Sequence, residues 1–339
     1  MSAGVPRDFT YIKPSKRRLS DYEAVSTYVQ VDPDQPYVQY YMRTEEGRAA
    51  WRPESTRLTH PHWYDFRDPG RYWQRTYVRM QAEQERAIAR LVEDAKAAGS
   101  LQAMDPEWVT RILRDHHRVW SFFEYGLFRA FAVASREALA DPIGQALSFQ
   151  AFDHMRHAQA VVLFLLDLED DIEGFSDRGA KERWLAEPAY QPLRALTERA
   201  MAFDDWAELC VVTNFVLLPL LAEVGVGSLL RENAPAHRDL ATPVIVLTTE
   251  RDRRRNRAVA GELVRMAFDE KNPGATANRA VIQSWFESWQ TPALEAAQAL
   301  APIWNEIPHP VRSFDAALES ARSTQRVLAE EHGLAECLP

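Results

Sequence analysis

The sequence has little cysteine and no excess of positive charge, and each shortage excludes a class of protein. Among 339 residues there are two cysteines, Cys210 and Cys337, too few for a disulfide framework or for an iron–sulfur site built within this chain. Acidic residues outnumber basic ones, 49 to 40, which gives a net charge of −9 at pH 7. Because clustered lysine and arginine supply most of the affinity for nucleic acids, this charge opposes a nucleic-acid or anionic-membrane partner.

Segments that could enter a membrane are also scarce. Residues 1–18 place charges and prolines where a signal peptide needs an apolar core of about 7–15 residues. The longest apolar stretch, 209–230, is long enough to cross a bilayer, but it contains Asn214, Pro219 and Glu223. We interpret it as a buried core helix, and we expect a cytoplasmic protein.

What the sequence does contain is apolar residues, 46% of the total, which is enough for a large core. Residues 1–73 are rich in aromatic residues and proline and show no lasting helical period. We interpret them as an extended arm, which covers either this chain's own bundle or, as we predict, a partner subunit. The candidate interface residues are Tyr37, Tyr40, Tyr41, Trp51, Trp63 and Tyr64.

After the arm, apolar residues recur at helical spacing almost throughout. Three Asp-Pro pairs, which begin at Asp68, Asp105 and Asp141, each predict a helix with aspartate as its N-cap and proline in its first turn. No alternating strand pattern and no repeat of fixed length competes with the helices, so we predict an all-α chain in which residues 74–339 form one bundle domain. After a first helix that ends near Gly99, further helices are expected near 107–139, 143–168, 181–201, 204–230, 240–270, 277–305 and 311–332.

Several polar residues fall where the helical pattern points inward. Glu124 lies in a stretch that is apolar nearly all round, so we predict that it is buried. His154 and His157 share an apolar face of the next helix, and Arg253 and Asn256 share one of a later helix. Buried polar groups need partners, and these helices can supply them to one another.

This pattern resembles the ligand set of di-iron carboxylate proteins with a ferritin-like fold, in which inward-facing Glu residues and Glu-x-x-His pairs hold two irons. Phe-Glu-Tyr at 123–125 resembles the first-glutamate helix, and Phe-Asp-His-Met-Arg-His-Ala-Gln at 152–159 resembles the D-E-x-R-H-x-Q segment. Asp-Arg-Arg-Arg-Asn at 252–256 resembles a second such segment. In this alignment the six ligand positions are Glu124, His154, His157, Leu217, Arg253 and Asn256.

Only Glu124 and His157 keep the residue type that the resemblance requires. Arg253 adds positive charge where carboxylates should offset that of the iron, so we expect this chain to bind no metal. Our hypothesis is that Arg253 replaces the metal as the counter-charge to Glu124. His154, His157 and Asn256 would then complete a hydrogen-bonded network.

Further segments extend the likeness to the β subunit of the hydroxylase of bacterial multicomponent monooxygenases, in the toluene, phenol and alkene branch, with its ribonucleotide-reductase-like bundle. They are His-Trp-Tyr-Asp-Phe-Arg-Asp-Pro at 62–69, the stretch 184–194 and Ala-Phe-Asp-Asp-Trp at 202–206. The resemblance implies a non-catalytic scaffold, with no catalytic or cofactor-binding residue of its own. Its expected partner is a di-iron α subunit that oxidises an alkene or aromatic hydrocarbon with O₂ and NADH-derived electrons.

The resemblance also implies the other components. They are a γ subunit in an (αβγ)₂ assembly, a regulatory protein and a Rieske ferredoxin, with FAD and [2Fe–2S] in separate electron-transfer components.

Two alternatives remain open. A catalytically active di-iron subunit would need complete Glu-x-x-His pairs, and the nearest approach is 152–157. An all-α enzyme similar to terpene cyclases would need an aspartate-rich motif in the acidic cluster 167–173, but Gly174 stands where its last aspartate should be. We interpret that cluster as a solvated helix end.

Overall fold

The computed structural model describes residues 16, 18–28 and 52–338. All regular elements in these ranges are helices, which confirms the all-α prediction. The longer elements are α1 (Asp21–Tyr28), α3 (Gln74–Ala97), η3 (Trp108–His117), α4 (Arg118–Glu137), α5 (Asp141–Asp171), α6 (Ala180–Ala186), α7 (Gln191–Met201), α8 (Trp206–Val212), η5 (Thr213–Arg231), α9 (Ala241–Phe268), α10 (Ala275–Ala299) and α12 (Phe314–Glu331). The short ones are η1 (Pro53–Ser55), η2 (Trp63–Asp65), η4 (Pro188–Tyr190), η6 (Ala234–His237), α11 (Ala301–Trp304) and η7 (Ala335–Cys337).

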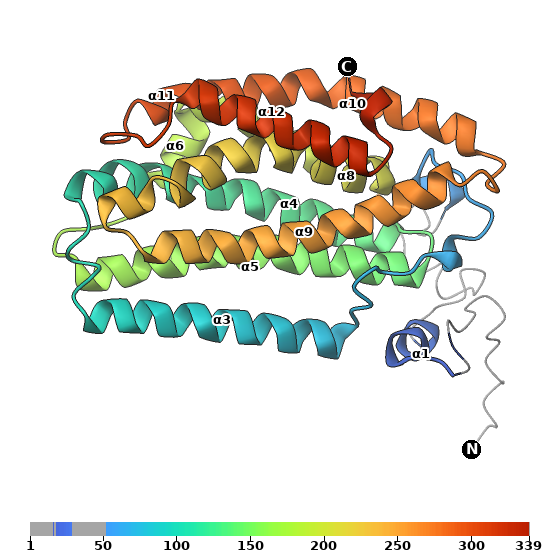
Figure 1. Ribbon diagram of the computed structural model, residues 1–339, viewed down its shortest axis with the longest axis horizontal. Helices are drawn as coiled ribbons and strands as arrows, with labels where there is room; N and C mark the ends of the chain where they lie inside the picture. Colours follow the sequence, from blue (N-terminus) through green and yellow to red (C-terminus); the bar gives the residue numbers. More distant parts are fainter. Residues whose placement is uncertain (1–15, 17, 29–51, 339) are drawn as a thin grey trace.

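The long helices lie nearly parallel to the longest axis of the molecule (Figure 1). Helix α3 lies along one side of the bundle and α10 and α12 along the other. Helices α4, α5, α9 and η5 lie between them, and α9 contacts both α5 and η5. The core between these helices contains large buried side chains, among them Trp108, Trp206 and Trp285.

Of the three Asp-Pro pairs, the one at Asp105 starts a helix as predicted, with aspartate as the N-cap and proline in the first turn. The helix that leads into η3 begins at Pro106, and Asp105 caps it by accepting the Glu107 N–H at 2.9 Å. Helix α5 begins at Asp141 itself, so this aspartate lies in the first turn instead of capping it.

The prediction for Asp68 is wrong. Its carboxylate accepts the backbone N–H groups of Gly70 and Tyr72 within a turn. Arg71 in that turn has φ of +51°, a left-handed conformation that a helix cannot contain. Helix α3 therefore starts only at Gln74.

Prolines divide two of the predicted helices. The helix expected at 181–201 is split into α6, η4 and α7 because Pro188 and Pro192 cannot continue a helix from its interior. The one expected at 277–305 ends at Ala299, and Pro302 lies in the first turn of the short α11.

The apolar stretch near the centre of the chain is a core helix, as predicted. Helical structure runs from Trp206 to His237, and its most apolar window has a mean hydropathy of 2.1 but is 94% buried inside the bundle. Asp205 caps its start by accepting the N–H groups of Ala207 and Glu208. The η5 part is π-helical and contains Leu217, which is buried.

Pro219 lies inside η5, and a distant helix contacts the same part of that helix. Because proline has no N–H, it cannot donate to the carbonyl of the preceding turn. Gln325 of α12 donates to the Phe215 carbonyl at 3.0 Å, and its side chain also exchanges hydrogen bonds of 2.8 Å with Gln290 of α10. These contacts connect α12 to the middle of the core helix.

The described part of the arm packs on this chain's own bundle. Leu58 and Phe66 belong to the hydrophobic core. Trp63 lies edge-on to Trp206 with ring centroids 5.6 Å apart, and Tyr64 packs against the same core. The helix α1 also interrupts the extended backbone predicted for the arm. The other predicted interface residues, Tyr37, Tyr40, Tyr41 and Trp51, lie outside the described ranges, so their contact with a partner stays a prediction.

Candidate functional site

The inward-facing polar residues meet at the centre of the bundle. Glu124 comes from α4, His154 and His157 from α5, and Arg253 and Asn256 from α9. Each is at most 6% exposed, as their helical patterns predicted. Charged groups buried this deeply are stable only when they are paired and hydrogen-bonded.

Glu124 accepts hydrogen bonds on both carboxylate oxygens. Arg253 Nη2 donates to Oε1 at 2.8 Å, and Trp120 Nε1 donates to the same oxygen at 3.1 Å. The Nδ1 atoms of His154 and His157 lie 2.7 and 3.4 Å from Oε2. The predicted ion pair between Arg253 and Glu124 is therefore present.

A second cluster adjoins this one and centres on two aspartates, Asp153 and Asp252. Arg255 donates to both of them, and Arg156 Nη1 donates to Asp252 Oδ2 at 3.1 Å. Asn256 donates to Asp153 Oδ2 at 2.9 Å. Asn256 thus enters the predicted network through Asp153 and not through a direct bond to Glu124.

His157 joins the two clusters, because its Nε2 lies 3.2 Å from Asp252 Oδ2 while its Nδ1 faces Glu124. Helix α3 completes the arrangement. Gln81 Nε2 lies 2.9 Å from an oxygen of each aspartate, and Tyr77 donates its hydroxyl to Asp153 at 2.8 Å. Four helices are therefore connected through one buried polar network.

Our sequence reasoning did not assign a role to the two aspartates, although a signal was present. Asp153 and Arg156 have the same Asp-x-x-Arg spacing as Asp252 and Arg255. Residues three apart lie on the same face of a helix, so a repeated pair of this kind on two helices can form crossed ion pairs. The structure has this crossing, with Arg156 on Asp252 and Arg255 on Asp153.

The surroundings of these groups favour their charged forms. Burial alone would raise the pKa of Glu124, but the hydrogen bonds from His154 and His157 and the charge of Arg253 hold that pKa well below its usual value. Burial alone would lower the pKa of His157, yet its bonds to Asp252 and Glu124 outweigh this effect and raise the pKa. The protonated form of His157, which can donate to both carboxylates, is thus favoured.

The raised pKa of His157 predicts a loss of stability at alkaline pH. Protonated His157 contributes its full stabilisation below about pH 6.5, its pKa in the unfolded chain, and this contribution is lost as pH rises through the higher pKa of the folded state. Between pH 6.5 and 9 the melting temperature of the wild type should therefore fall more steeply than that of His157→Gln. Exposed His62→Gln is the control and should follow the wild type. Equal slopes for wild type and His157→Gln would show that His157 is not charged in the folded protein.

The donor set does not fit a di-iron centre. Ligand atoms of Glu124, His154 and His157 do lie within 4.8 Å of one another. The second half of such a centre, however, would fall on Leu217, which is an apolar core residue, and on Arg253, whose guanidinium is bonded to the Glu124 carboxylate. Two irons need several carboxylates to balance their charge, and this cluster offers one.

The acidic cluster of the terpene-cyclase alternative lies at the end of α5. There Asp167 forms a salt bridge of 2.7 Å with Lys96 of α3. Glu169, Asp170 and Glu173 are partly or fully exposed to solvent. This placement agrees with a solvated helix end.

Comparisons with known proteins agree with this architecture. The family model described as Methane/Phenol/Alkene Hydroxylase matches residues 41–271. The hydroxylase small subunit of propane 2-monooxygenase from Rhodococcus jostii (strain RHA1) is 32% identical over 97% of this chain and 89% of its own length. The beta chain of methane monooxygenase component A from Methylosinus trichosporium is 26% identical over 88% of this chain and 77% of its own.

A solved structure shows the same fold. The phenol hydroxylase from Pseudomonas sp. OX1 superposes with a TM-score of 0.77 at 18% identity, over 95% of this chain and 91% of the matched one. The family match covers the four helices that meet at the polar network, α3, α4, α5 and α9. The chain thus belongs to the methane/phenol/alkene hydroxylase family.

Proposed function

We propose that this chain is the non-catalytic small (β) subunit of a multicomponent monooxygenase hydroxylase and acts as a scaffold for a larger di-iron subunit. The observation that supports this function is the Arg253–Glu124 ion pair, which stands where the resemblance to di-iron carboxylate proteins would place two iron ligands. A guanidinium in this position supplies positive charge without any open coordination site. The chain can therefore preserve the four-helix core of its family without oxygen chemistry of its own.

The same proposal includes the other components. A di-iron α subunit and a γ subunit would form an (αβγ)₂ hydroxylase in the cytoplasm, with a regulatory protein and a Rieske ferredoxin. FAD and [2Fe–2S] would belong to the electron-transfer components. The substrate class is a small hydrocarbon, an alkene or aromatic compound, to which the names of the relatives add alkanes such as propane and methane.

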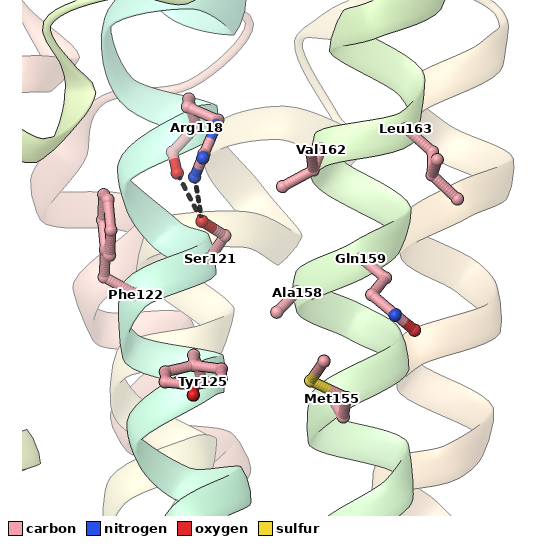
Figure 2. Close-up of a pocket in the computed structure, with 9 residues that line it drawn as sticks. All are labelled: Arg118, Ser121, Phe122, Tyr125, Met155, Ala158, Gln159, Val162 and Leu163. Atoms are coloured by element: carbon pink, nitrogen blue, oxygen red, sulfur yellow. Dashed lines mark hydrogen bonds between the residues drawn. The ribbon is translucent and has the colours of Figure 1, made fainter.

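The outer face of α4 and α5 supports a contact with that larger subunit. Between the two helices lies an apolar groove of about 410 Å³, with Phe122 and Tyr125 on one side and Met155 and Val162 on the other (Figure 2). Leu163 on its rim is 60% exposed. Phe152, Leu166 and Val133 on the same two helices are also exposed. A run of exposed large apolar side chains is typical of a surface that another protein covers.

Co-expression with the larger hydroxylase subunit tests this function. Leu163→Asp should weaken the complex roughly a hundredfold, because an unpaired carboxylate in an apolar interface costs several kcal/mol. Val311→Asp is the matched control, since Val311 is 61% exposed but lies in the loop before α12. Size-exclusion chromatography measures the complex, and metal analysis should find iron only in fractions that contain the larger subunit.

Two results would contradict the proposal. Stoichiometric iron in this chain alone would make it a catalytic di-iron subunit. A complex that survives Leu163→Asp as well as Val311→Asp would place the interface elsewhere.

A further inference from the structure

A small polar cavity lies between η5, α9 and α12, beside the buried network but opening toward solvent. Four arginines line it, and we call it the arginine pocket: Arg231, Arg253, Arg254 and Arg257. Glu223 and Glu250 are the acidic residues in its lining. Its volume is about 170 Å³, below the roughly 300–1,000 Å³ of pockets that hold drug-sized ligands.

The acidic residues of the lining do not neutralise its arginines. Glu250 and Glu223 both pair with Arg231, and Arg253 pairs with Glu124 outside the pocket. Arg254 and Arg257 form no hydrogen bond or salt bridge with any residue in the described ranges. The pocket therefore has an excess of positive charge.

Two of these guanidinium groups also have buried donors that lack an acceptor. The Nε atoms of Arg253 and Arg257 are both buried and find no hydrogen-bond partner in the part of the chain that the structure describes. Burial lowers the pKa of Arg257, the nearby charges of Arg253 and Arg254 lower it further, and the smaller effect of Glu331 raises it. A buried cation with unused donors is costly, and such groups point to a bound ion, water or ligand.

We propose that the arginine pocket binds a single oxyanion group, either a phosphate or a carboxylate. Planar guanidinium groups bind both kinds of anion through paired N–H donors, and one such group with a few waters fits the volume. Arg254 is exposed, so an anion can reach the pocket from solvent. The anion is either free in solution or a carboxylate carried by a partner subunit.

The experiment compares Arg257→Gln with Arg251→Gln in the full-length chain, purified in the complex in which it is stable. Arg251 lies on the same helix α9 but is exposed and outside the pocket, so its substitution removes the same charge. Inorganic phosphate is the probe, with chloride at equal ionic strength as the reference. Phosphate should raise the melting temperature of the wild type and of Arg251→Gln. Its affinity for Arg257→Gln, measured by calorimetry, should be at least about tenfold weaker, because a hydrogen bond to a charged group is lost.

Other outcomes distinguish the source of the anion or overturn the proposal. If phosphate has no effect but Arg257→Gln, unlike Arg251→Gln, loses its partner subunit, a carboxylate of that partner fills the pocket. If phosphate stabilises wild type and Arg257→Gln equally, or if phosphate has no effect and both variants keep their partner, the pocket does not bind an oxyanion.

Discussion

Substitution of Glu124 by alanine is expected to lower the free energy of unfolding by about 3–5 kcal/mol, the usual cost of removing one partner from a buried ion pair. The carboxylate is the acceptor for Arg253, His154, His157 and Trp120. Its loss leaves the Arg253 guanidinium buried without its counter-charge and two buried histidines without their shared acceptor. Equilibrium unfolding in urea at pH 7 measures the change.

Glu83→Ala is the matched control for this variant. Its side chain is 60% exposed and, among the residues that the structure describes, pairs only with Arg79 at the surface, so its removal should cost about 0–1 kcal/mol. Similar unfolding curves for Glu124→Ala and Glu83→Ala would mean that the buried network does not depend on the Glu124 charge.

Substitution of Arg253 by methionine should also destabilise the protein by about 3–5 kcal/mol, and it should create an affinity for divalent metal that the wild type lacks. When the guanidinium is removed, the Glu124 carboxylate and the imidazoles of His154 and His157 remain as possible metal ligands. Their ligand atoms lie within 4.8 Å of one another. Zinc accepts three such nitrogen and oxygen ligands together with water. Metal that binds only the folded state stabilises it by about 2.7 kcal/mol at a hundredfold excess over the dissociation constant.

The measurement is the melting temperature with and without Zn²⁺ for the wild type, Arg253→Met and the double variant Arg253→Met with His154→Ala. Of the three proteins, Arg253→Met should show the largest rise in melting temperature with zinc, and the wild type should show none. The double variant, which lacks one ligand, should lose most of the response. Equal responses of wild type and Arg253→Met to zinc would show that Arg253 does not take the place of a metal.

Much of the fold could be predicted because helical periodicity is a local property of the sequence. The long helices and the burial of Glu124, His157 and Arg253 follow from which residues share an apolar face. The errors have local causes as well. Asp68 looks like a helix cap, but the left-handed Arg71 directs its carboxylate into a turn.

For the site, the sequence predicts which polar residues are buried but not which of them bond to each other. Helical patterns show which residues point inward, but partner choice depends on how helices are rotated and shifted against one another. That Asn256 enters the network through Asp153, for example, does not follow from the helical pattern. Arg255 and Asp153 form an ion pair although they lie about a hundred positions apart in the sequence. A single sequence does not show which of its distant residues come into contact.

The position of Gln81, bonded to aspartates of two different helices, has a geometric consequence. The hydrophobic effect has no direction, whereas these hydrogen bonds require a particular alignment of donor and acceptor. A shift of α5 by one residue would rotate Asp153 and His157 about 100° around the helix axis and remove both from their partners. The crossed aspartate–arginine pairs thus favour one register of α5 against α9, and the hydrogen bonds of Gln81 to both aspartates add α3 to the same alignment.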